Sequence, residues 1–430
     1  MRVTKKYSFI AALLGSLVLH GSSTPAQAGI LVQCPGDTDG SASWEGGEVQ
    51  PPDTKCMHLG AGDGFVTMAD GKSQYMFGFS DLTGHATAPA APAEPVNVME
   101  IGTLAARFPA PPIILDEGDE FYLTLTNVGM IMRPDLFDPH TVHYHGFPQA
   151  AAIFDGVPDA SVSINMGSSI TYYYKINDPG TFMYHCHVEA TEHMQMGMLG
   201  NLYVRPSQNK LPAQTFPATP TFPTGFNHTP WDNATGTGNR YAYNDGDGTT
   251  YYDVEYPIQI GSFDSAFHDA SIDVQPLPFA MMEDNYPMLN GRGYPDTVIP
   301  GDLPAQPDEN GGKVTQKESS LITAAPGQRV LLRISNLNVT RFYTLGSMGI
   351  SMQVVGKDAK LLRGPTGKNL YYDTNSVTVG GGESVDTILE IPAEAAVGTK
   401  YFLYTTNLNY LSNDAEEAAF GGMMTEIRIN

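Results

Sequence analysis

The sequence predicts an all-β protein built from two β-sandwich domains. Three observations support this class. The 430 residues include 45 glycines and 32 prolines, which is typical of a turn-rich protein. Many apolar segments alternate with polar residues at a period of two, the pattern of half-buried strands. The strand-like run at 118 to 127 has a counterpart at 327 to 336, which indicates an internal duplication.

The first 28 residues have the pattern of a secretory signal peptide. Basic residues between positions 2 and 6 precede a short apolar stretch, and Ala26 and Ala28 form a small-x-small cleavage site. No later segment reaches the roughly 18 uninterrupted apolar residues that a membrane-spanning helix needs. We therefore expect an exported protein, periplasmic or secreted, that does not cross a membrane.

Residues 29 to 95 are expected to form an irregular N-terminal extension. This stretch is rich in Gly and Asp and ends in an Ala/Pro-rich run. It contains Cys34 and Cys56, 22 positions apart, which we expect to form a disulfide. Such a bridge would contribute about 3 kcal/mol on the chain-entropy model.

The two sandwich domains are expected at 96 to 205 and 251 to 430. In the first, strands are predicted around 112 to 127, 168 to 174, 181 to 187 and 201 to 204. In the second, strands are predicted at 327 to 336 and 376 to 390. Residues 206 to 250 are dense in Pro, Thr, Gly, Asn and Asp, and are expected to be a linker.

Two short stretches hold six of the eleven histidines and the remaining cysteine. Residues 140 to 146 read His-Thr-Val-His-Tyr-His-Gly, and residues 185 to 198 begin His-Cys-His. Two imidazoles, one thiolate and a weak thioether are the ligands of a blue-copper electron-transfer site. An unpaired thiol in an oxidising compartment is a liability unless a metal holds it as thiolate. The sequence therefore predicts copper at Cys186.

Strand alternation separates the side chains of these stretches into two sites, because residues two apart share a face. Cys186 faces away from its two neighbouring histidines, and His140 can face the same side as Cys186. The first expected site contains His140, Cys186, His193 and Met198. The second contains His143, His145, His185 and His187. The backbone that joins Cys186 to His185 and His187 would be a short covalent path for electrons between the two sites.

These motifs resemble those of the multicopper oxidases, the family of laccases, ascorbate oxidase and ceruloplasmin. The first stretch is similar to the family's His-Pro-x-His-Leu-His-Gly motif, and the second to its His-Cys-His…His…Gly-Met motif. The resemblance implies a type 1 copper on His140, Cys186, His193 and Met198. It implies that His143, His145, His185 and His187 bind the type 2/type 3 cluster that reduces oxygen to water. It also implies two cupredoxin-like Greek-key domains, the second without copper ligands.

The chain departs from this family at the second site. The family's trinuclear cluster takes eight histidines from two domains, whereas residues 251 to 430 contain only His268. Three hypotheses remain open. An oxidase could complete its cluster through a second copy or a partner domain. The protein could instead resemble copper nitrite reductases, or be a non-enzymatic blue-copper carrier or copper-binding protein.

The expected partners follow from the first hypothesis. The electron donor would be a phenol, a metal ion or a small redox protein, and oxygen would be the acceptor. The formal net charge of −23 argues against nucleic acid or an anionic membrane as a partner.

Overall fold

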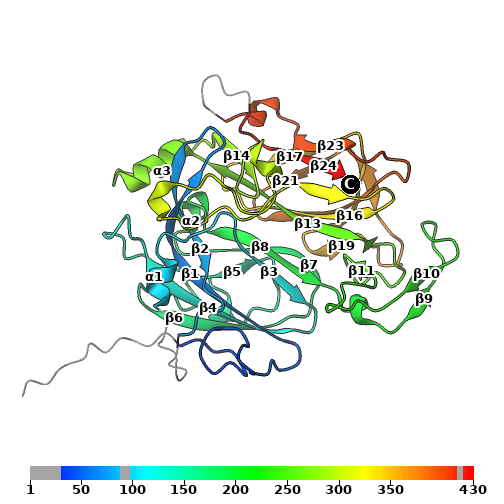
Figure 1. Cartoon of the computed structure of the whole chain (residues 1–430), viewed down its shortest axis with the longest axis horizontal. Coiled ribbons are helices and arrows are strands. Elements are labelled where there is room, and N and C mark those ends of the chain that lie inside the picture. The colour runs from blue at the N-terminus through cyan, green and yellow to red at the C-terminus, as the bar shows by residue number, and fades with distance from the viewer. Residues whose placement is uncertain (1–30, 88–96, 414–419) are drawn as a thin grey trace, which may run out of the picture.

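The computed structural model describes residues 31 to 430 except 88 to 96 and 414 to 419. The expected signal peptide therefore lies outside the described residues. The described chain is mostly strand, and its two sandwich domains lie one above the other in Figure 1. None of the helices in the described part is long and apolar enough to cross a membrane.

The first domain contains two four-stranded sheets. One has the order β2-β1-β4-β6 and the other the order β3-β8-β7-β5. Their bounds are β1 Thr54–Thr67, β2 Ser73–Asp81, β3 Ala110–Asp116, β4 Glu120–Gly129, β5 His143–His145, β6 Ser169–Lys175, β7 Gly180–His185 and β8 Leu199–Arg205. Leu59, Leu123, Phe182 and Leu202 are among the buried apolar residues that fill the space between the sheets.

The expectation of an irregular extension is wrong for residues 54 to 81. Strand β1 pairs with β2 and also runs parallel to β4, so this segment belongs to the first sandwich. The glycines of this segment are typical of a loop. In the structure, however, they lie in strands, at positions where a neighbouring segment comes too close for a side chain. A Cβ at Gly62 would lie 2.6 Å from a methyl of Val128. Cys34 and Cys56 are joined by a disulfide, which ties residues 34 to 53 to β1.

The second domain also consists of two sheets. Their orders are β14-β13-β16-β22-β18-β19, with β20 on β18, and β15-β24-β23-β17-β21. The bounds are β13 Val254–Phe263, β14 Tyr286–Leu289, β15 Ile322–Ala324, β16 Arg329–Asn336, β17 Tyr343–Met348, β18 Met352–Lys357, β19 Lys360–Leu361, β20 Tyr372–Thr374, β21 Ser376–Val379, β22 Glu383–Glu390, β23 Lys400–Thr405 and β24 Met424–Ile429. A separate apolar core lies between these sheets.

The segment expected as a linker contains short strands instead. They are β9 Gln214–Phe216, β10 Phe226–His228 and β11 Arg240–Tyr241, and β11 pairs with β12 Tyr251–Tyr252. Phe216, His228 and Tyr241 pack their rings together and bury them. This aromatic contact explains why a turn-rich segment is ordered here.

The described helices are short. They are α1 Val98–Gly102, α2 Ala190–Gln195 and α3 Ser265–Ile272. Single 3-10 turns occur at Ala152–Phe154, Ser207–Lys210, Phe279–Met281, Asp296–Val298, Asp308–Asn310 and Leu408–Leu411.

A buried polar network and an apolar cluster join the two domains. Strands β7 and β8 of the first domain contact β13, β16 and β22 of the second. Thr181 on β7 donates a hydrogen bond to Asp386 on β22, and Arg333 on β16 is fully buried against Glu255 and Asp386. Met183 and Leu199 share an apolar cluster with Phe263 and Leu337. These contacts fix the second domain beside the end of β7, where the metal-binding motifs lie.

Candidate metal centres

Strands β5 and β7 bring the two histidine-rich motifs side by side. They pair in antiparallel register, with His143 opposite His185 and His145 opposite Met183. The chain leaves β7 after His185, and Cys186 and His187 follow directly. The pairing places Cys186 on the core side and the paired histidines on the side toward the second domain.

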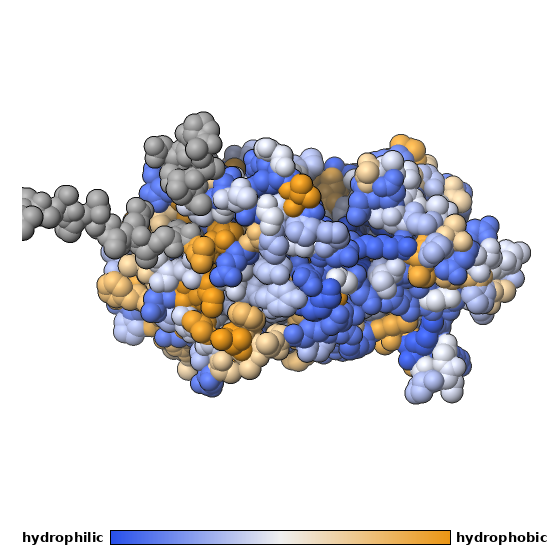
Figure 2. All heavy atoms as spheres, turned by 90° about the horizontal axis from the view of Figure 1, so that it is seen from below, coloured by the Kyte–Doolittle hydropathy of each residue, from blue (hydrophilic) through white to orange (hydrophobic). Residues whose placement is uncertain are grey.

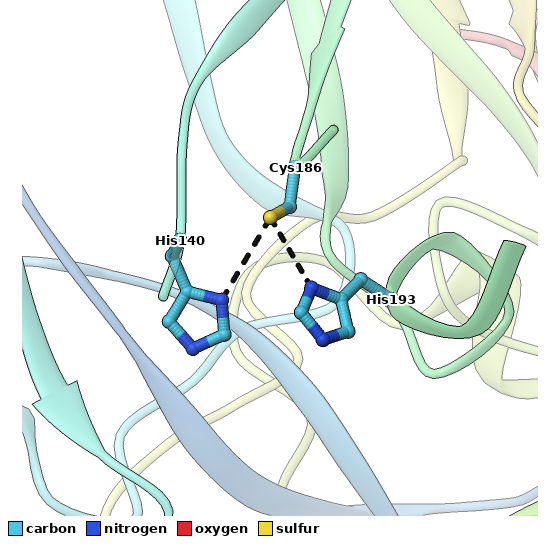
Figure 3. Close-up of side chains that lie close together, drawn as sticks. All are labelled: His140, Cys186 and His193. Carbon is cyan, nitrogen blue, oxygen red and sulfur yellow. Dashed lines mark hydrogen bonds between the residues drawn. The ribbon is translucent and has the colours of Figure 1, made fainter. Parts of the chain in front are cut away.

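His140, Cys186 and His193 form a buried group that we call the cysteine site (Figure 3). The sulfur of Cys186 lies 3.7 Å from Nδ1 of His140 and 3.2 Å from Nδ1 of His193. All three residues are fully buried. Both Nδ1 atoms point toward the sulfur, so a copper ion bound between them would meet two imidazoles and one thiolate. The donor set therefore fits a type 1 copper.

The helix α2 explains how His193 reaches the cysteine site. Five residues separate His187 from His193. The chain turns at Glu189, which has a left-handed backbone, and then forms α2. This turn brings His193 back to the sulfur. Met198 is fully buried, its carbonyl accepts a hydrogen bond from the Cys186 amide, and its own amide donates to the carbonyl of His193.

The electrostatics of the cysteine site favour a thiolate. Burial opposes ionisation, but the nearby His193 and His140 lower the pKa of Cys186 well below its usual value. Burial also opposes charge on His193, yet the Cys186 thiolate and Asp138 raise the pKa of His193 to about 10. A carboxylate oxygen of Asp138 lies 3.8 Å from Nε2 of His193. Thiolate is the form of cysteine that binds metals, whereas His193 with this raised pKa carries a proton at neutral pH and would release it when a metal binds.

His143, His145, His185 and His187 form the second group, which we call the histidine site. Ring nitrogens of the first three lie within 4.8 Å of one another. The ring of His187 has its centre 5.1 Å from that of His143 and 5.5 Å from that of His185. The structure therefore brings together all four residues that the sequence predicted for this site.

Two carbonyl groups orient the histidine rings. Nδ1 of His143 lies 2.6 Å from the carbonyl oxygen of Asp155, and Nδ1 of His185 lies 2.8 Å from that of Cys186. Each Nδ1 must donate a proton there, which leaves Nε2 free to bind a metal. Burial and the neighbouring His143 and His145 lower the pKa of His185 to about 3, so its ring is neutral. Neutral imidazole is the metal-binding form.

The histidine site opens into a pocket of about 570 Å³ between the domains. Its far wall comes from the second domain, at residues 337 to 342 and at Gly381 and Gly382. Of the described residues in this wall, none is a histidine, a cysteine or a carboxylate. The sequence did not predict this wall, because nothing local in 337 to 342 or 381 to 382 indicates contact with the first domain.

Three histidines outside the motifs are held elsewhere. His268 contacts the carbonyls of Tyr75 and Gln195 through its two ring nitrogens. His58 contacts Thr126, and His228 contacts Tyr241 and Leu211. His268 is the second domain's single histidine, so that domain offers the histidine site no imidazole. The eight-histidine trinuclear cluster therefore does not fit the residues present.

The exposed surface near the cysteine site carries several apolar side chains. Ile131, Met132, Phe137, Val162 and Met166 are exposed. They lie in the loops before and after the bridge between His140 and Ile164. Figure 2 shows apolar side chains gathered toward the end of the molecule that carries α1, on a face that is otherwise mostly polar. Since the cysteine site is fully buried, electrons must cross a layer of protein to reach it.

Comparison with known proteins agrees with this geometry. Residues 89 to 209 match the family model described as multicopper oxidase. A multicopper oxidase from Talaromyces pinophilus is 36% identical over 105 residues, which cover 24% of this chain and 16% of the relative. Laccase 1 from Metarhizium acridum is 34% identical over 106 residues, with the same coverage of 24% and 16%. The matched region spans about one sixth of these relatives.

Solved structures show the same fold over most of the chain. The blue copper oxidase from Nitrosomonas europaea aligns with a TM-score of 0.57 and 20% identity, covering 87% of this chain and 86% of that one. The copper nitrite reductase from the same organism aligns with a TM-score of 0.51 and 16% identity, covering 88% and 94%. The fold is therefore that of two cupredoxin-like sandwiches.

Proposed function

We propose that the protein is a copper-dependent oxidoreductase, because residues 89 to 209 match the family model described as multicopper oxidase and the two histidine-rich groups offer ligands that suit copper. The cysteine site would hold a type 1 copper that accepts electrons from a donor, and the histidine site would hold copper that supplies the reduction of oxygen. The observation that carries this proposal is the placement of two metal-binding groups on adjacent residues of one segment, with Cys186 directly between His185 and His187.

In the cysteine site, we assign His140, Cys186, His193 and Met198 as the type 1 copper ligands. Copper held by thiolate and imidazole cycles between two oxidation states with little rearrangement. The chain supports this chemistry by holding both Nδ1 atoms toward the sulfur and by excluding water from all three residues. The carboxylate of Asp138 lies 3.8 Å from Nε2 of His193, close enough to interact with the charge of the ring.

In the histidine site, we assign His143, His145, His185 and His187 as the residues that hold the second copper centre. The Asp155 and Cys186 carbonyls fix the rings of His143 and His185. The backbone from Cys186 to His185 is a short covalent path for electrons between the sites. The pocket admits a small oxidant to the same rings.

We infer that the donor is a phenol, a metal ion or a small redox protein, and that the protein is exported. The pattern of residues 1 to 28 and the disulfide between Cys34 and Cys56 support export. Expression in a host with a secretory pathway, followed by N-terminal sequencing, is expected to give a mature chain that starts at Gly29. A mature chain that still begins at Met1 would contradict export.

The Cys186→Ser variant tests the proposed function. Loss of the thiolate is expected to abolish the intense visible absorption and to stop donor oxidation, while the circular dichroism spectrum stays unchanged. Oxygen uptake with a phenol, Fe(II) or Cu(I) as donor, measured beside nitrite consumption, identifies the oxidant. A variant that keeps the colour would end the type 1 assignment, and nitrite consumption without oxygen uptake would favour the nitrite reductase alternative.

A further inference from the structure

The second domain covers part of the histidine site. A Cβ placed on Gly382 would lie 2.5 Å from Nε2 of His145, which shows how closely this backbone approaches the ring. Gly382 has a φ of +84°, in a conformation that favours glycine. Nε2 of His145 therefore faces the second domain, while its Nδ1 faces Nε2 of His185 at 3.4 Å. Only Nδ1 of His145 is directed toward the other histidines.

The nitrogen positions suit a single metal ion. Copper–imidazole bonds are about 2.0 Å long, so two nitrogens on one ion are at most about 4 Å apart. The 3.4 Å between His145 and His185 lies within this limit. A ring nitrogen of His143 lies within 4.8 Å of the other two, so a shift of about 1 Å would bring it within this limit, and its Nε2 is the one left free by Asp155. Three imidazoles with an open side toward the pocket form a site of the catalytic type.

The same wall leaves little room for a symmetric partner. A second copy meeting this chain face to face would have to place its four histidines where residues 337 to 342 and the turn at Gly381 and Gly382 stand. These residues are anchored by their own domain, since Asn338 is buried and bonded to Asn336, and Gly382 donates its amide to the carbonyl of Asn336.

We propose that the histidine site binds one copper ion through His143, His145 and His185, in place of the trinuclear cluster that the family resemblance implies. His187 lies beside this ion's ligands and lines the pocket. One chain then binds two copper ions, one in each site. The inference rests on the proposed function for the identity of the metal, and it specifies the number of ions that the second site holds.

Metal counting on the full chain tests this proposal. The metal-free protein is loaded with excess copper(II) and desalted, and copper per chain is measured together with the EPR signal and the mass in solution. We expect two coppers per chain at any oligomeric state, all visible by EPR, half of them type 1 and half type 2. More than two per chain, or a fraction silent in EPR because of coupled copper pairs, would overturn the proposal. A count of one would also overturn it.

Single-site variants assign the two ions. His145→Ala is expected to lower the count from two to one and to keep the blue colour, whereas Cys186→Ser lowers the count to one and removes the colour. A His145→Ala protein that retains two coppers would overturn the assignment. If the unmodified protein binds no blue copper, the proposed function itself is contradicted. The failure of the one-copper proposal can therefore be told apart from the failure of the proposed function.

A matched pair of glycine variants tests the part played by the second domain. Gly382→Ala would press a methyl group against His145, so we expect it to lose the EPR-visible type 2 copper and to keep the type 1 copper. Gly367 has a similar φ of +80° and open space around its Cβ position. Gly367→Ala carries the same backbone strain and is expected to keep both ions. Equal copper contents in the two variants would show that the wall does not shape the site.

Discussion

Cys186 and its two histidine neighbours show how one residue step separates two chemical environments. The sulfur lies in the buried core of the first domain, among residues with no exposed surface. The rings on either side of it line the open pocket between the domains. Each environment suits its proposed task, since electron transfer is favoured by a dry and rigid site and oxidant reduction needs access.

A histidine substitution separates the two tasks. His143→Ala removes a ring nitrogen from the histidine site and leaves the cysteine site unchanged. We expect the visible absorption to stay at its original intensity and steady-state turnover to fall by more than about 100-fold, beyond the usual effect of losing an outer-shell partner. Absorption spectra and oxygen-electrode rates check this result. Unchanged turnover would show that the second site takes no part in the reaction.

At the residue scale, strand alternation predicts that His140 and Cys186 separate from His143, His145 and His185, and the structure groups these residues in that way. The groups that orient the rings could not be predicted. The carbonyl of Asp155 reaches His143 from 12 residues away, and backbone carbonyls leave no signature in a sequence.

At the scale of elements, the pairing of β1 with β4 buries a histidine that lies outside both candidate metal sites. His58 on β1 contacts the hydroxyl of Thr126 on β4 and is fully buried. Burial, with a smaller effect of His85, lowers the pKa of His58 from 6.5 to about 4. The folded protein therefore holds His58 neutral in a pH range in which the unfolded chain would protonate it.

This shift predicts a loss of stability in mild acid. The folded pKa is below the unfolded one, so the unfolded chain binds more protons between pH 6.5 and 4. The contribution is fully present above pH 6.5 and is lost as the pH falls through this window, by up to about 3 kcal/mol. Urea unfolding at several pH values measures it. His58→Gln is expected to flatten the slope in this window, and an unchanged slope would contradict the assignment.

The elements that the sequence predicted are those with clear alternation, such as β4, β16 and β22. Strands β1 and β2 were missed because glycines occupy positions where neighbouring strands come too close for a side chain, as at Gly60 and Gly62. Helix α2 was missed because six residues are too few for an apolar period to appear. Short elements of this kind depend on tertiary contacts more than on local preference.

At the scale of the whole molecule, a buried charge network holds the two domains together. Arg205 of β8 in the first domain pairs with Glu255 of the second at 2.5 Å. The guanidinium of Arg333 lies 3.1 Å from Glu255 and 3.8 Å from Asp386, and its side chain has no exposed surface. Burial alone would raise the pKa of Glu255. The charges of Arg333 and Arg205 outweigh the effect of burial and lower this pKa to about 2. The internal duplication in the sequence predicts two domains. It does not predict how the domains contact each other, because the residues of this charge network are far apart in the sequence.

Removing Arg333 is expected to destabilise both the interface and the fold. Arg333→Ala leaves the buried Asp386 without a cation, takes one arginine away from Glu255 and removes a hydrogen bond to Thr181 of the first domain. Removing one partner of a buried pair typically costs about 3–5 kcal/mol. Lys360→Ala breaks an exposed pair that also spans the domains, with Asp178, and is expected to cost at most about 1 kcal/mol. Denaturant unfolding of the two variants compares these costs. Similar values for both would show that the buried network adds no stability beyond that of a surface pair.

The glycine turn that lies against His145 has a consequence for the product of the reaction. A chain with one ion in each site stores two electrons, whereas reduction of oxygen to water requires four. Two electrons and two protons convert oxygen to hydrogen peroxide (O2 + 2e− + 2H+ → H2O2). A second domain that offers the histidine site a glycine turn and no imidazole would then limit the reduction of oxygen to peroxide.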